Sequence, residues 1–285
     1  MCKVRVVLKP FVILFLLAAI VVGIGCQSST PLPTVTPTPP CPLSFSPVGD
    51  ELNATQSTQL ISRLQKESLP FANFYGNESA QLKHYTIHWF HDPDLTLDNA
   101  RTYVNNGNHS AYIELGNMSP DQEAFTIAHE LASIVIASKG YPTSIVYCHP
   151  QYANLTFALL QMIDTPLRDS ILAQYGFDVD KRYTWQFASL FSSGCGDPSN
   201  SIDLLTNGCD YAQVVLYWED VLGNHGVPLD IENQWLLCLL MSRAEGYGII
   251  AIINDTKGYN TSEKARTIFR KIIDANQLQN EVWVP

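Results

Sequence analysis

The residues with the clearest chemical potential are an adjacent histidine and glutamate, His129 and Glu130, in the stretch FTIAHELASIV. On a helix, residues four positions apart share one face, so two histidines at that spacing present two nitrogen atoms to one tetrahedral zinc ion. The glutamate can then accept a proton from the zinc-bound water, whose pKa falls to roughly 7. Here the second histidine position is Ser133. Because a serine hydroxyl is a neutral and weak ligand, Ser133 would lower zinc affinity greatly.

The His-Glu pair belongs to a segment with the end signals of a helix. Ser119 suits the N-cap, Pro120 suits the first helical position, and Gln122 completes a capping box. Gly140, directly after Lys139, is typical of a helix C-terminus. The sequence therefore predicts one well-bounded helix that carries His129 and Glu130.

The order of a strand, AYIEL, followed by this helix resembles zincin-type metallopeptidases, whose active-site helix follows an edge strand. The resemblance covers about Tyr112 to Asp178. It implies that His129 is the first zinc ligand and Glu130 the general base. Zincins take a third ligand from the following helix, and His149 and Asp164 are the candidates here.

Three interpretations of this motif remain open. With Ser133 in the ligand position, we expect an inactive pseudoenzyme without a cofactor, whose former cleft binds a peptide or a cell-envelope component. The alternative is an active zinc metallopeptidase with an unusual ligand set. The third is an unrelated α+β surface domain, in which His129 bonds a carbonyl group or Glu114. Under the first interpretation, Ser133→His would restore the ligand spacing and create tight zinc binding.

The elements around the helix predict an α+β fold. Residues 83–90 alternate between apolar and polar side chains, which indicates a half-buried strand. Residues 101–115 read as two strands around an Asn-Asn-Gly-Asn turn. After residue 154, apolar residues recur every three to four positions, as in helices. We expect a small N-terminal antiparallel sheet followed by a mostly helical body with a zincin-like active-site helix, all within residues 49–285.

The first 25 residues have the pattern of a signal peptide. Three cations precede an apolar run that is shorter than the roughly 20 residues needed to span a bilayer. The small residue before Cys26 resembles the lipobox of bacterial lipoproteins, which implies that Cys26 carries the lipid. An ordinary cleaved signal or an uncleaved N-terminal anchor is the alternative. Residues 26–48, rich in Pro, Thr and Ser, predict an extended linker, so we expect a domain anchored outside a bacterial cell membrane.

The charge balance argues against nucleic-acid binding. The formal net charge is −10, and loss of the three signal-peptide cations would change it to about −13. Such a surface repels phosphate backbones, which makes nucleic acid an unexpected partner. The expected partners are the membrane, through the lipid on Cys26, and the peptide or cell-envelope ligand that the zincin resemblance implies.

The cysteines are consistent with export. Cys195 and Cys209 flank a stretch rich in Gly, Asp, Pro, Ser and Asn, and an exported loop of this length can be closed by a disulfide. We expect these two residues to pair, with a contribution to stability of about 3 kcal/mol. The spacings of the seven cysteines match no Cys-x-x-Cys zinc module.

Overall fold

The computed structural model describes residues 46–95, 100–181, 198, 200–224 and 229–285. The described residues belong to one compact unit, Pro40–Pro285. The predicted signal peptide, Cys26 and nearly all of the predicted linker lie outside the described residues. Within the described ranges, no helix has both the length and the apolar character needed to cross a bilayer.

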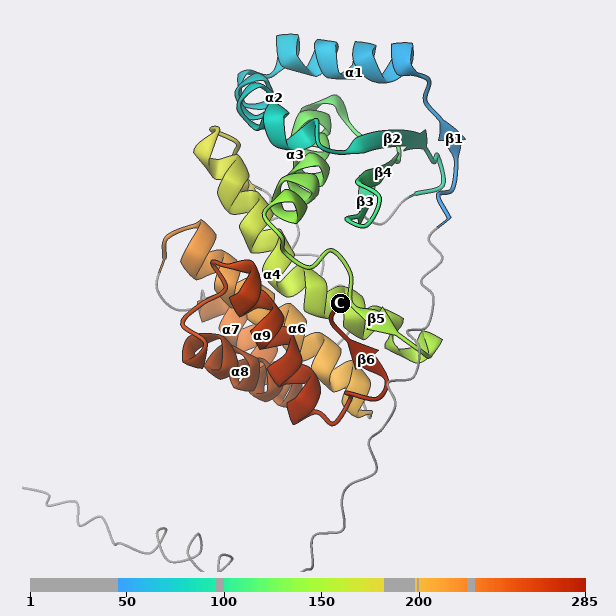
Figure 1. Ribbon diagram of the computed structural model, residues 1–285. Coiled ribbons are helices and arrows are strands. Elements are labelled where there is room, and N and C mark those ends of the chain that lie inside the picture. The colour runs from blue at the N-terminus through green and yellow to red at the C-terminus, as the bar shows by residue number, and fades with distance from the viewer. Residues whose placement is uncertain (1–45, 96–99, 182–197, 199, 225–228) are drawn as a thin grey trace, which may run out of the picture. The chain divides into compact units, whose positions relative to one another are not determined.

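Helices make up most of the described chain (Figure 1). They are α1 (Ala54–Glu67), α2 (Leu69–Leu82), α3 (Pro120–Ser138), α4 (Ala153–Gln174), α6 (Ser201–Leu216), α7 (Leu229–Cys238), α8 (Leu240–Asp255) and α9 (Ser262–Ala275). Two shorter helices are the 3-10 turn η1 (Pro150–Tyr152) and the π-helix η2 (Tyr217–Val221), which continues α6. The strands are β1 (Asp50–Glu51), β2 (Thr86–His91), β3 (Ala100–Asn105), β4 (Ser110–Leu115), β5 (Val146–Tyr147) and β6 (Val282–Trp283). The predicted α+β class, with a small sheet and a mostly helical body, is confirmed.

The main sheet has the strand order β1-β2-β4-β3. The β3–β4 hairpin is antiparallel, as predicted, but β4 runs parallel to β2, so the prediction of a wholly antiparallel sheet is wrong. The hairpin returns β4 into the space between β2 and β3, and this placement gives β4 the direction of β2. The strand AYIEL within β4 is consequently internal, and the edge strand beside it is β3.

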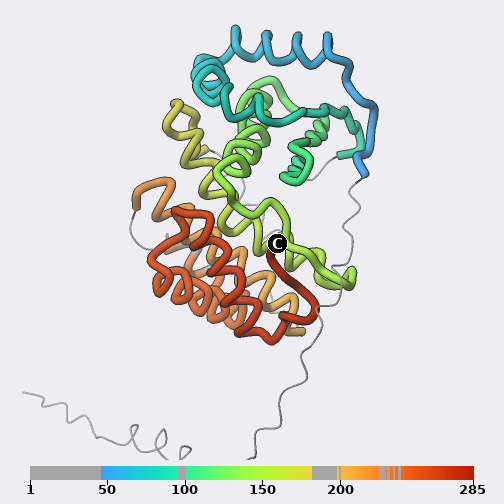
Figure 2. Tube along the Cα trace, in the orientation of Figure 1, coloured from blue at the N-terminus to red at the C-terminus, as the bar shows by residue number. Residues whose placement is uncertain are grey.

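The sheet and the helices form two large hydrophobic cores, beside smaller apolar clusters. The first core joins α1, α2 and α3 to one face of the sheet, where Trp89, Ala111 and Ile113 are buried. The second core joins α4, α6, α8 and α9 to the small β5–β6 sheet. Ile136 of α3 packs in the second core and Leu172 of α4 packs in the first, so the α3–α4 pair lies where the cores meet. In Figure 2, the segments before α3 and after α4 lie on opposite sides of this pair.

Helix α3 has the predicted limits. Ser119 has the extended backbone of an N-cap, but its hydroxyl donates to the Gln122 side chain at 2.8 Å and makes no cap bond, so the predicted capping box does not form. Gly140 follows the helix with φ of +81°, a conformation that glycine adopts at low cost. Every residue from Thr126 to Ala137 is buried. Helix α3 is therefore enclosed on all sides in its C-terminal half.

The predicted Cys195–Cys209 disulfide is wrong. Cys209 is a free, fully buried cysteine, and Cys195 lies outside the described residues. Residues 201–209 of the stretch interpreted as a loop instead belong to α6, which begins after the N-cap Asn200 and places Cys209 in the second core. Burial raises the pKa of the Cys209 thiol well above its usual value. Cys148 does form a disulfide, with a partner that the structure does not describe.

Helices α6 and α8 approach closely at two glycines, Gly208 and Gly246. A Cβ atom added at Gly246 would lie 2.5 Å from Cδ1 of Tyr211, which is fully buried. We expect Gly246→Ala to lower the free energy of unfolding by about 1–3 kcal/mol, because the packed core cannot accommodate the methyl group. Gly248→Ala on the same helix is the matched control, since nothing lies within 4 Å of its added Cβ. It should stabilise the protein by about 0.5–1 kcal/mol, and urea denaturation measures both changes.

Candidate functional site

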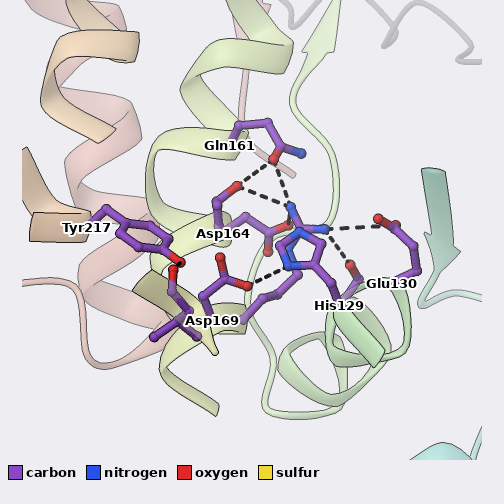
Figure 3. A network of polar contacts seen from close by, with 10 residues as sticks. His129, Glu130, Gln161, Asp164, Asp169 and Tyr217 are labelled. Atoms are coloured by element: carbon purple, nitrogen blue, oxygen red, sulfur yellow. Dashed lines mark hydrogen bonds and ion pairs between the residues drawn. The ribbon is translucent and has the colours of Figure 1, made fainter. Parts of the chain in front are cut away.

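His129 is held by a carboxylate from the neighbouring helix (Figure 3). Its Nδ1 lies 2.7 Å from Oδ1 of Asp169 on α4, and both side chains are buried. A contact of this kind fixes the tautomer and the orientation of an imidazole ring, as it does for metal-bound histidines. The partner is not Glu114, which instead pairs with Arg101 on β3 and accepts a hydrogen bond from the backbone.

The centre of the site is the guanidinium group of Arg168, which is 3% exposed. Its Nη1 donates to the hydroxyl of Ser133 at 3.1 Å and lies 3.9 Å from a carboxylate oxygen of Glu130. Its Nη2 donates to Oε1 of Gln161 at 2.8 Å and to Oδ2 of Asp164 at 3.0 Å. The Arg168 side chain thus joins Glu130 and Ser133 on α3 to Gln161 and Asp164 on α4.

Helix geometry explains why these groups converge. On α4, Gln161, Asp164 and Arg168 follow one another at intervals of three and four residues, which places them on one face. Glu130 and Ser133 are three residues apart on α3, and the two helices pack against each other. The buried surface between α3 and α4 is therefore polar along one stripe and apolar elsewhere.

The donor set does not fit a zinc ion. A zinc-binding histidine usually contacts a carboxylate as His129 contacts Asp169, and Glu130 follows His129 at the motif position of the general base. However, Ser133 accepts a hydrogen bond from a guanidinium, and Asp164 is paired with the same cation. Zinc at this point would lie against a fixed positive charge. Across the described ranges, no three His, Cys, Asp or Glu side chains are grouped so that they could hold a metal.

The structure brings together only part of the predicted ligand set. Glu130 and Asp164 lie against Arg168, and His129 is held beside them by Asp169, but His149 does not reach this group. The His149 side chain is 62% exposed, and its Nε2 lies 3.3 Å from a carboxylate oxygen of Glu281. It precedes α4, and about 16 Å of helix separates the first residue of α4 from Asp164 at 1.5 Å per residue. His149 therefore belongs to the β5–β6 end of the chain.

Sequence reasoning missed Arg168, Asp169 and Gln161. A signal for Arg168 was present, since it has the spacing of a helical ion pair with Asp164 within a largely apolar segment. Charged residues in such a segment are rarely buried unless they are paired. The partnership of Arg168 with Ser133 had no local signal, because these residues are 35 positions apart.

The site contains more acidic groups than its one guanidinium can balance. Burial raises the pKa of the Asp164 carboxyl group to about 6; Arg168 acts to lower it, and Glu130 and Asp169 act to raise it. A carboxyl group with this pKa is partly protonated in mildly acidic solution. The charge of the α3–α4 junction therefore changes between about pH 5 and pH 7.

We expect Asp164→Asn to remove a pH-dependent part of the stability. Because the folded-state pKa lies above the unfolded one, protonation stabilises the fold fully below about pH 4, and this contribution is lost as the pH rises through 6. Relative to the variant, the wild type should lose up to about 3 kcal/mol of unfolding free energy between pH 4 and 7. Urea denaturation across this range measures the difference. Asp274→Asn, at an exposed carboxyl group of α9, is the control, and parallel profiles for wild type and Asp164→Asn would contradict the assignment.

The comparisons with known proteins identify no relative. No family model, no curated protein and no solved structure matches this chain. The resemblance to zincins therefore rests on His129, Glu130 and the helix that carries them. What the site can do follows from its own geometry.

Proposed function

We propose that this chain is an exported bacterial lipoprotein whose zincin-like domain is not a peptidase and acts by binding a peptide or an envelope component at the cell surface. The observation that carries the proposal is the hydrogen bond from Arg168 to Ser133. A guanidinium occupies the side of α3 where a second zinc ligand would have to act. Without a metal-bound water, Glu130 has no activated proton to accept.

The exported location is supported by two independent features. The first is the N-terminal signal pattern that ends at Cys26. The second is the disulfide of Cys148, because disulfides persist in oxidising compartments outside the cytoplasm. A lipid on Cys26 and the Pro/Thr-rich linker would keep the folded domain near the membrane.

The catalytic part of the proposal is tested by metal content. Protein purified without added metal should hold well under one zinc per chain, and its hydrolysis of unstructured peptides should not exceed that of Glu130→Gln. Ser133→His alone should still bind no zinc tightly, because Arg168 remains against the new imidazole. This outcome is the opposite of the tight zinc binding that the sequence predicts for Ser133→His. One zinc per wild-type chain, with hydrolysis that Glu130→Gln abolishes, would instead favour the active zinc metallopeptidase.

The location is tested separately at Cys26. In bacteria, Cys26→Ala should abolish labelling by a radioactive fatty acid and release the protein from the membrane fraction, because the acylated thiol is lost. Cys209→Ala is the control, since that thiol is buried in the folded domain and should not affect labelling. Unchanged labelling and membrane association of Cys26→Ala would refute the lipoprotein assignment.

A further inference from the structure

We infer that Arg168 is an internal counter-ion that holds α3 against α4, in the structural role that a bridging metal ion would have. The inference concerns what joins the two cores, whereas the proposed function concerns catalysis and location. Zinc content tests the proposed function. The stability of Arg168 variants tests this inference, and either can fail alone.

The contacts of Arg168 resemble those of a cation in a cage of oxygen atoms. The described polar neighbours of its two terminal nitrogens are all side-chain oxygens, from Ser133, Glu130, Gln161, Asp164 and Thr165, at 2.8 to 3.9 Å. The first two residues belong to α3 and the others to α4. A planar guanidinium with several donors can satisfy acceptors on both helices at once, whereas the compact ammonium group of lysine cannot.

The charge of Arg168 is needed because the carboxyl groups around it are shielded from water. The side chains of Glu130, Asp164 and Asp169 are 8%, 13% and 0% exposed. Within the described chain, Arg168 is the cation that pairs with Glu130 and Asp164. Removing one partner of a buried ion pair leaves an uncompensated charge, which costs far more than losing an exposed pair.

The position of Arg168 makes this charge a link between the two cores. Helices α3 and α4 each contribute apolar side chains to both cores, and the guanidinium lies between the two helices. Loss of the charge should therefore weaken the junction between the cores. Hydrogen exchange should increase first in α3 and α4, before it increases in α9.

The test is a set of variants in the full chain. Arg168→Met keeps the length of the side chain and removes its charge. At pH 8 it should lower the melting temperature by roughly 10 °C relative to wild type. At pH 5 the loss should be less than half as large, because Asp164 can then be protonated. A role in packing alone would give equal losses at both pH values.

Three further variants complete the design. Adding Asp164→Asn to Arg168→Met should recover at least half of the loss at pH 8, and should restore folding if Arg168→Met alone does not fold. Arg168→Lys keeps the charge and should lose less than Arg168→Met. Arg63→Met removes a paired but 43% exposed guanidinium and should shift the melting temperature by no more than about 2 °C.

The outcomes separate a counter-ion from a packing residue. The inference is overturned if Arg168→Met is as stable as wild type at pH 8. It is also overturned if its loss is the same at pH 5 and pH 8 and Asp164→Asn recovers none of it. The inference is likewise overturned if the double variant Arg168→Met/Asp164→Asn does not fold.

Discussion

The buried guanidinium of Arg168 is the constraint on which the arrangement of α3 and α4 depends. A charge removed from water must be surrounded by hydrogen-bonding partners, and here they come from both helices. Each partner must place an acceptor oxygen within reach of the guanidinium, and this requirement fixes the relative position of the helices. Ser133 is suited to its place because a hydroxyl is small, neutral and able to accept. A histidine at the same position would bring a larger group against the cation.

The same constraint changes the chemistry of the His-Glu pair. Asp169 orients His129 as a carboxylate orients a metal ligand, and Glu130 keeps the place of a general base. Their environment, however, supplies a fixed organic cation where a peptidase would need an exchangeable metal with bound water. The residues that suggest hydrolysis thus belong to a buried polar cluster that joins α3 to α4.

The two cores explain other differences between expectation and structure. Cys209 has the sequence context of an exposed loop, yet it lies within α6 because the residues after Asn200 can bury an apolar face against α4 and α8. Pro166 does not interrupt α4, which continues through it as a buried helix shared by both cores. In each case tertiary packing outweighs a local signal.

The sequence by itself determined the local features of this protein. The ends of α3, the β3–β4 hairpin, the half-buried strand β2 and the helical second half follow from Pro120 and Gly140, turn residues and apolar spacing, which act over a few residues. Only the tertiary structure decided the parallel pairing of β2 with β4, the burial of Cys209, the exclusion of His149 and the meeting of Arg168 with Ser133. These depend on contacts between residues far apart in the chain, and no local pattern encodes which distant oxygen atoms will surround a buried charge.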